Sequence, residues 1–464
     1  MRLLSNVGVL LLLVFLLTLQ IFSQTSDTSK TRPYEAIANQ IITAGLNSCK
    51  AYPMLFELTQ TVGARLSGSP QAEKAVEWGK KTMESLGFQN VHLEPVKVPH
   101  WVRGSKEEAL ILNSSKTIPL KICALGGSVA TPEDGITAEV LEVKSFDELK
   151  ALGDQAKGKI IFFNRPLDKT KFSTFEAYGG AVNQRGGGAA EAAKAGGIAA
   201  LVRSMTTRLD DVPHTGAMNY VDTVGKVPAA AVSTIGANLL DSLLSIDKNL
   251  KVKLKLSCQT LPDVESANVV GELTGTDLPN EVIVIGGHLD SWDKGQGAHD
   301  DGAGCAHTLE ALRLLKELNL KPKRTIRAVL FMNEENGLRG GKAYAEKERP
   351  GEKHIAAIET DAGGFSPRGF GVQTDSLRFE KISRWAYLFE SIGADKIQKG
   401  GGGADIGPLA RAGVPVIGLT PERQRYFDYH HSDSDTIDKV NERELELGAE
   451  ALAILTYVLA QEGL

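Results

Sequence analysis

The sequence has little of what marks nucleic-acid-binding or polytopic membrane proteins. Its 464 residues include 52 Lys and Arg against 57 Asp and Glu, a net charge of −5, with no basic block. Nucleic-acid binding needs clustered cations, so no nucleic-acid partner is expected. Apolar residues make up 42% and charged residues 23%, values close to those of soluble globular chains. This composition excludes a mainly disordered, collagen-like or polytopic membrane protein.

Cysteine is also scarce, and several common catalytic motifs are missing. The four cysteines form no Cys-x-x-Cys pair, which argues against a thiolate zinc site, and they allow three disulfide pairings among which the sequence does not choose. The chain lacks the His-Glu-x-x-His helix of single-zinc proteases and a phosphate loop with Lys and Ser/Thr. A nucleotide-binding role based on its glycine runs is therefore weakly supported.

The N-terminal residues are typical of targeting. Arg2 is the only charge before Asp27, and an apolar run at 7–19 is followed by small or polar residues. This predicts a signal peptide over residues 1–23, with cleavage near Ser23 or Gln24. The alternative is an uncleaved anchor, but the run is shorter than the roughly 20 residues of a spanning helix. We expect a secreted or extracytoplasmic protein (periplasmic, extracellular or lysosomal, depending on the host) without stable membrane insertion after cleavage.

The rest of the chain shows two different sequence patterns. Residues 118–261 alternate short β-rich runs with glycine-rich stretches such as 186–188, which predicts an inserted β-rich domain between segments 24–117 and 262–464. From residue 267 onward, apolar strands at 282–285, 325–332 and 355–358 alternate with helices. This alternation predicts an α/β fold with a mostly parallel sheet between helices.

Acids and histidines follow those strands. Ligands of open α/β sheets bind beyond the carboxyl ends of the strands, so the loops are expected to converge. Taken alone, each group has an ordinary alternative, such as a helix cap or a solvated surface acid. Together they are costly to place after buried strands unless cations neutralise them. The residues are His288, Asp290, Asp300, Asp301, Glu334, Glu335, Glu359, Asp361, His430 and His431.

Imidazoles and carboxylates are the ligands of zinc in hydrolases. Two neighbouring zinc ions need one shared carboxylate, with one His and one acid on each metal. This makes five protein ligands, and a further carboxylate must stay free as a base. The chain supplies such a set.

The same residues closely resemble the motifs of the dizinc exopeptidases, which include leucyl-type aminopeptidases and glutamate carboxypeptidases. The resemblance rests on the runs 286–290 and 300–304, on Glu334-Glu335, on Asp361, and on His431-Ser432-x-x-Asp435-Thr436. It spans nearly the whole mature chain. It implies a zinc exopeptidase fold, in which residues 118–261 resemble a protease-associated insertion.

The resemblance also implies a role for each residue. Asp300 bridges two zinc ions; His288 and Asp361 complete one metal, and Glu335 and His431 the other. Glu334 is the general base. Asp290 orients His288, and the peptide bond between Asp300 and Asp301 is cis. His430 stands where glutamate carboxypeptidases have an oxyanion-binding Tyr, whereas His299, His307 and Cys305 lie outside the ligand pattern.

The expected function is hydrolysis of peptide bonds in dipeptides or short peptides. The alternatives are a broad aminopeptidase acting on longer peptides and a non-catalytic, receptor-like ectodomain on the same fold, although every ligand position is filled here. Residues 400–403 with Asp405 are a candidate pocket wall or simply a flexible glycine turn. The partner is a small peptide substrate, and the sequence leaves the oligomeric state open, a homodimer included.

Overall fold

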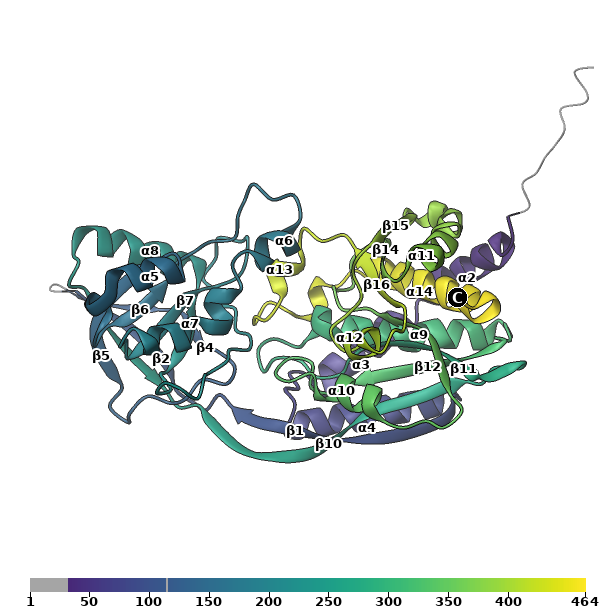
Figure 1. The fold of residues 1–464 in the computed structure, drawn as a ribbon, viewed down its shortest axis with the longest axis horizontal. Helices are drawn as coiled ribbons and strands as arrows, with labels where there is room; N and C mark the ends of the chain where they lie inside the picture. Colours follow the sequence, from purple (N-terminus) through teal and green to yellow (C-terminus); the bar gives the residue numbers. More distant parts are fainter. Residues whose placement is uncertain (1–31, 114–115) are drawn as a thin grey trace, which may run out of the picture. The chain divides into compact units, whose positions relative to one another are not determined.

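The computed structural model describes residues 32–113 and 116–464 (Figure 1). The expected signal peptide, residues 1–23, lies outside the described residues. Within them, no helix has both the length and the apolar character that crossing a bilayer requires. The described chain begins with helices α2 and α3, Glu35–Ser48 and Ala51–Thr61. All four cysteines are free thiols, and three of them are buried.

The first of two mixed sheets contains the three strands predicted at 282–285, 325–332 and 355–358. Its central strands β12, β11, β13 and β16 are parallel neighbours, whereas antiparallel pairs flank them on both sides. The parallel centre confirms the α/β prediction, and the flanking pairs make the sheet mixed. In spatial order its strands are β1 (Gln89–Val102), β10 (Gln259–Leu273), β12 (Arg324–Phe331), β11 (Leu278–His288), β13 (Lys353–Glu359), β16 (Val416–Pro421), β14 (Pro367–Gln373) and β15 (Lys396–Lys399).

Helices cover both faces of this sheet. On one face, Gly79 of α4 (Pro70–Ser85) packs against Leu330, and the Ser69 side chain caps the N-terminus of α4. On the other face, the neighbouring residues Val329 and Phe331 pack with Tyr344 and Leu409. Successive strand residues point to opposite faces, so buried strand runs are apolar throughout. The other covering helices are α9 (Ala303–Glu317), α14 (Glu442–Glu462), α10 (Arg339–Glu346) and α12 (Gly407–Arg411).

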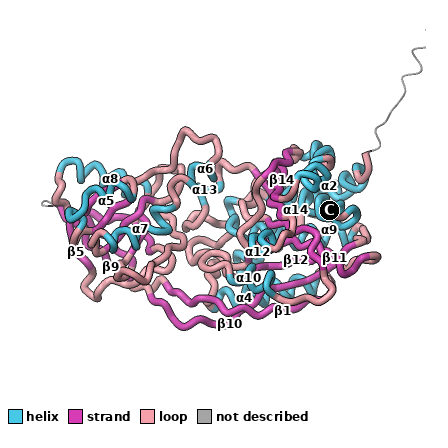
Figure 2. The backbone as a smooth tube through the Cα atoms, viewed as in Figure 1, coloured by secondary structure: helices cyan, strands magenta, loops and turns pink. Residues whose placement is uncertain are grey.

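The second mixed sheet is formed by residues 107–256 (Figure 2). It begins before the expected boundary at 118, because β2 and β3 belong to it. The compact unit Ala38–Leu464 contains both sheets, so the domain boundaries at 118 and 261 stay a prediction. Its strands in spatial order are β3 (Lys116–Leu120), β2 (Glu107–Asn113), β9 (Lys251–Leu256), β5 (Ile136–Val143), β6 (Ile160–Phe163), β7 (Ala199–Arg203), β8 (Ala229–Val232) and β4 (Ile122–Ala124).

Helices flank the second sheet. The glycine-rich run 186–188 lies inside one of them, helix α7, Asn183–Lys194. Gly188 packs there against the ring of Phe163, where a side chain would be crowded. The remaining elements are α5 (Phe146–Leu152), α6 (Thr174–Gly179), α8 (Thr234–Ile246), α11 (Ser376–Ser383), α13 (Tyr426–Tyr429), a π-type turn (Ala298–Gly302) and short 3₁₀ turns (Gly153–Ala156, Ala386–Ile392 and Ile437–Lys439).

A long antiparallel ribbon joins the two sheets. Strands β1 and β10 stay paired from Gln89 opposite Glu272 to Val102 opposite Gln259, and Figure 1 shows them running together. Trp101, at the end of β1, is buried in the core of the second sheet. The ribbon therefore places residues of the second sheet region within reach of the loops that follow the first sheet.

Candidate metal centre

The predicted ligands meet beyond the carboxyl ends of the central strands. His288 is the last residue of β11, and Glu335 follows the end of β12. Asp361 follows β13, and Asp300 lies in the π-type turn before α9. His431 comes from the loop after α13. The sheet thus gathers five side chains from distant parts of the chain.

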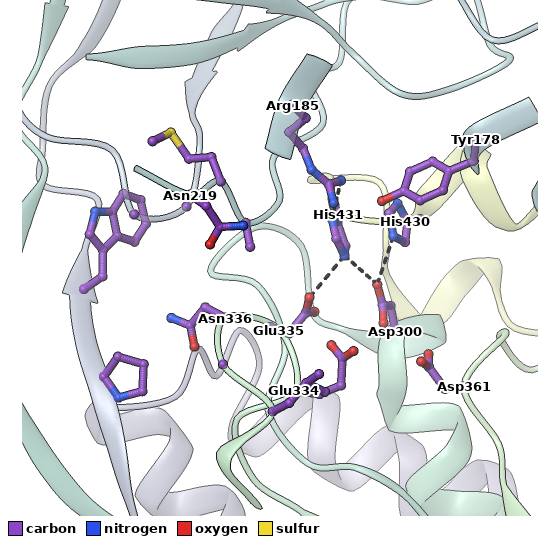
Figure 3. A pocket seen from close by; sticks show the side chains of 18 of the residues that line it. Tyr178, Arg185, Asn219, Asp300, Glu334, Glu335, Asn336, Asp361, His430 and His431 are labelled. Carbon is purple, nitrogen blue, oxygen red and sulfur yellow. Dashed lines mark hydrogen bonds and ion pairs between the residues drawn. The ribbon is translucent and has the colours of Figure 1, made fainter. Parts of the chain in front are cut away.

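Asp300 lies between two ligand sets and faces each with a different oxygen. Its Oδ1 is 3.2 Å from His288 Nε2, which is also 3.7 Å from Asp361 Oδ1. Its Oδ2 is 3.2 Å from His431 Nε2, which is also 3.1 Å from Glu335 Oε2 (Figure 3). The grouping matches the sequence-based assignment, with one His and one acid on each side of a shared Asp.

Burial and charge in this cluster favour a cation. Burial raises the pKa of Glu335 to about 7. The neighbouring imidazoles of His288 and His431 outweigh the burial of Asp300 and hold its pKa well below the usual value. Asp300 Oδ2 and Asp361 Oδ1 are both buried and accept no hydrogen bond. Buried acids without donors are costly unless cations lie between them, so the donor set fits bound metal ions.

Asp290 supports the centre in a way that differs from its predicted role. His288 Nδ1 lies 3.0 Å from the backbone oxygen of Asp290 and 3.8 Å from its carboxylate Oδ1. That Oδ1 instead accepts hydrogen bonds from the backbone N–H groups of Asn333 and Glu334, at 2.8 and 3.0 Å. The carboxylate therefore fixes the turn carrying the two glutamates, and the backbone oxygen contacts His288.

Two further carboxylates hold the backbone of the cluster. Asp301 accepts hydrogen bonds from the N–H groups of His288 and Gly304, and Asp435 accepts them from His299 and Asp300. The peptide bond between Asp300 and Asp301 is cis, as expected. These buried acids bind backbone donors and leave Asp300 free to face the two histidines.

The residues expected outside the ligand set are buried packing residues. The ring of His299 stacks on Phe365 with centroids 4.2 Å apart. His307 Nδ1 lies 3.0 Å from the hydroxyl of Thr360, and Cys305 donates to the backbone oxygen of His288. None of these three belongs to a group of potential metal ligands among the described residues.

His430 lies beside the ligand set rather than apart from it. Its ring stacks on that of His431 with centroids 3.4 Å apart, and its Nε2 is 3.8 Å from Asp300 Oδ2. Burial and the neighbouring His431 lower the pKa of His430 well below its usual value, which favours the neutral ring. A neutral imidazole has one N–H to donate, and here it borders the pocket.

The cluster opens into a pocket of about 580 Å³. Part of its lining comes from the second sheet region, which sequence reasoning missed: Tyr178, Arg185 and Asn219 (Figure 3). The run 400–403 was a wrong candidate for the wall, since it does not line this pocket. Gly403 packs against the carboxylate of Glu359, and Gly401 against Gly371.

Comparison with known proteins assigns the chain to a family. Peptidase family M28 matches residues 268–456. Carboxypeptidase Q from Bos taurus is 38% identical over 431 residues, which cover 92% of this chain and 89% of that protein. The chain belongs to peptidase family M28. This M28 protein is therefore a metallopeptidase, and its resemblance to the dizinc exopeptidases is confirmed.

Other relatives support the family and the fold. Carboxypeptidase Q from Homo sapiens is 38% identical to the M28 protein over 89% of this chain and 85% of its own length. A Peptidase M28 precursor from Shewanella amazonensis has a crystal structure with TM-score 0.89 and 35% identity, covering 93% of this chain and 97% of that one. A zinc aminopeptidase from Bacillus subtilis shares the fold, with TM-score 0.65 and 21% identity over 88% and 94% of the two chains.

Proposed function

We propose that this protein is a two-zinc exopeptidase that hydrolyses dipeptides or short peptides. The observation that carries the proposal is the position of Asp300, whose two carboxylate oxygens face separate His-and-acid pairs. His288 and Asp361 would hold one zinc ion, Glu335 and His431 the other, and Asp300 both. Bound zinc supplies Lewis acidity, which polarises a carbonyl and lowers the pKa of water.

In this proposal Glu334 moves the proton. Its side chain lines the pocket, and its backbone N–H is held by Asp290. Burial, with further contributions from Asp361 and Glu335, raises the pKa of Glu334 well above its usual value. A base works best when its pKa is near the working pH, so this shift suits proton transfer. Glu334 would accept a proton from the attacking water and give it to the leaving amine.

Two other functions use the same fold. The structural relationship to the Bacillus subtilis zinc aminopeptidase favours a broad aminopeptidase as the second candidate. A receptor-like ectodomain needs no intact ligand set, and here all five ligand-type residues converge. A series of dipeptides, N-blocked dipeptides and longer peptides separates the candidates, because only a broad aminopeptidase releases N-terminal residues regardless of length.

The proposal also includes a cleaved signal peptide and an inserted domain. A signal peptide over residues 1–23 would direct the chain to secretion. The second sheet, with helices on its flanks, would correspond to a protease-associated insertion over residues 118–261. It supplies part of the pocket lining, which is consistent with a role in substrate binding.

The zinc content of the purified protein tests the proposal directly. We expect about two zinc ions per chain, because the two His-and-acid pairs share one bridging carboxylate. Elemental analysis after dialysis gives the ratio, and removal of metal by a chelator should abolish hydrolysis that zinc then restores. One ion per chain with full activity would contradict a bridging role for Asp300.

The substitution His430→Ala tests the residue beside the ligand set. We expect turnover to fall about 10²-fold with zinc content unchanged, because a single N–H donor to the reacting carbonyl is lost. The zinc content of the His430→Ala protein is the control. His299→Ala would not be a matched control, because it removes a ring that stacks on Phe365 in the core. Loss of one zinc ion would instead make His430 a metal ligand.

A further inference from the structure

The loop that carries His431 is held by a segment from another part of the chain. His431 follows helix α13 and has a left-handed backbone, with φ of +61°. Residues other than glycine rarely adopt this conformation, and it persists only where the surroundings fix it. Besides local bonds to α13, the loop is bound by His214 and Thr215, which lie 216 positions before His430 and His431 and belong to the second sheet region.

Thr215 contacts His431 at two points. Its backbone N–H donates to the backbone oxygen of His431 at 2.8 Å, and its own backbone oxygen lies 3.4 Å from His431 Nδ1. Zinc on Nε2 would leave the ring proton on Nδ1, which can then donate to that oxygen. Arg185 Nη1 also lies 3.4 Å from Nδ1, but a guanidinium cannot accept this proton. An antiparallel bridge between His214 and Ser432 continues the pairing of the two segments.

The side chain of His214 adds a third contact. It is 1% exposed, and its Nδ1 lies 2.7 Å from the backbone oxygen of His430. Only an N–H can face a carbonyl oxygen at that distance, so Nδ1 is the donor. The backbone N–H of His214 donates to Ser204 Oγ at 2.9 Å, and that hydroxyl donates to the backbone oxygen of Val232 at 2.7 Å. Because Ser204 follows β7 and Val232 ends β8, the second sheet anchors the imidazole.

A buried ion pair anchors Thr215. Its Oγ1 lies 3.3 Å from Arg103 Nη2, and Arg103 binds both carboxylate oxygens of Asp293 at 2.8 and 2.5 Å. Asp293 lies in the loop after β11, where the backbone N–H of the preceding Trp292 donates to Glu335 Oε1 at 3.1 Å. The supports of the His431 loop therefore lead back to the acid that faces the same proposed zinc position.

We propose that His214 is a positioning residue for the zinc ligand His431, so that the second sheet region forms part of the metal centre. The Nδ1–H of His214 fixes the carbonyl of His430, and with it the peptide plane from which His431 continues. Without this donor, the peptide can turn and carry His431 Nε2 away from Asp300 and Glu335. This inference rests on the proposed two-zinc function and deepens it.

Two substitutions of His214 separate the hydrogen bond from packing. His214→Asn keeps an N–H donor near the position of Nδ1 but leaves a cavity, whereas His214→Leu keeps most of the volume and has no donor. Packing alone would make His214→Leu the milder change, and the hydrogen bond would make His214→Asn the milder one. Tyr220→Phe is the matched control in the same region. It removes a hydroxyl that accepts from Val129 N–H and donates to the backbone oxygen of Val227.

Zinc affinity is measured on the full-length proteins by competition with a chelator, beside kcat and KM for a dipeptide and thermal unfolding of the zinc-free protein. We expect His214→Leu to bind one of the two zinc ions about 10- to 100-fold more weakly, the usual effect of losing an outer partner of a metal ligand. Its kcat should fall with little change in KM and recover in part with excess zinc. His214→Asn should bind zinc more tightly than His214→Leu, and Tyr220→Phe should match the wild type.

Other outcomes overturn the inference in recognisable ways. Wild-type zinc affinity in His214→Leu, or zinc binding no tighter in His214→Asn than in His214→Leu, would exclude the hydrogen bond and leave the peptidase proposal intact. If His214→Leu does not fold, Ser204→Ala replaces it, since it removes only the hydroxyl that anchors His214. It should lower zinc affinity to a smaller extent, and an unchanged affinity would overturn the inference. A wild-type protein that binds no second zinc ion, or hydrolyses no peptide when loaded, would overturn the proposed function instead.

Discussion

Replacing Glu334 by Gln is expected to slow hydrolysis by about 10²–10⁴-fold, the usual contribution of a positioned general base. Glutamine keeps the shape of the side chain but cannot accept a proton. The backbone N–H of residue 334 still donates to Asp290, so the turn should keep its conformation. Zinc analysis and thermal unfolding should match the wild type, while turnover measured with a dipeptide falls.

Glu335→Gln is the matched control for that substitution, because it changes the neighbouring residue in the same way. Glu335 Oε2 is 3.1 Å from His431 Nε2, and Oε1 accepts a hydrogen bond from Trp292 N. Loss of its charge should weaken zinc binding, so excess zinc should restore part of the activity. Equal, zinc-restorable defects in both variants would show that the two roles are assigned wrongly, and normal activity in both would show that neither role exists.

Much of the ligand set could be predicted because strand ends are visible in a sequence. The apolar runs that became β11, β12 and β13 are followed within two to four residues by His288, Glu334-Glu335 and Asp361. Parallel strands bring their carboxyl ends to one edge, so their loops must meet. The flanking antiparallel strands have weaker apolar patterns in the sequence, and the full length of β10 was not predicted.

Arg185 could not be predicted in the same way. It lies in helix α7, more than ninety residues before the first strand that carries a ligand, and it precedes a run of three glycines. Its position depends on contacts between distant segments, including the hydrogen bond from Thr215 N to the backbone oxygen of His431 at 2.8 Å. Such contacts join segments that lie far apart in the sequence, and no local periodicity encodes them.

The contact between Asp290 and His288 shows a second limit of prediction from the sequence. The spacing of two residues from His288 correctly brought Asp290 next to that ring. It did not distinguish the backbone oxygen at 3.0 Å from the carboxylate at 3.8 Å. The side chain is buried and faces the turn at Asn333 and Glu334 instead. Residue type and spacing therefore identified Asp290 as a neighbour of His288. Which oxygen of Asp290 contacts the ring could be seen only in the folded chain.

Replacing Asp300 by Asn is expected to have the largest effect on the metal centre. Asn keeps one oxygen, but its amide nitrogen would face either His288 or His431, each now 3.2 Å from a carboxylate oxygen. A donor group cannot bind a cation, so one of the two zinc positions should lose its shared ligand. We expect the zinc content to fall from about two ions per chain to about one. Activity should fall about 10³-fold, which corresponds to about 4 kcal/mol of lost transition-state stabilisation.

The increase in melting temperature on adding zinc is an independent measure of zinc binding, because a ligand that binds only the folded state stabilises that state. This increase should be smaller for Asp300→Asn than for the wild type. Asp433→Asn is the control, since Asp433 lies in the same loop as His431 with its side chain 62% exposed and facing Lys294 at 3.9 Å. It should retain two zinc ions and full activity. If Asp300→Asn also retained two ions and the full zinc-dependent increase, Asp300 would not bridge, and the two His-and-acid pairs would bind their ions independently.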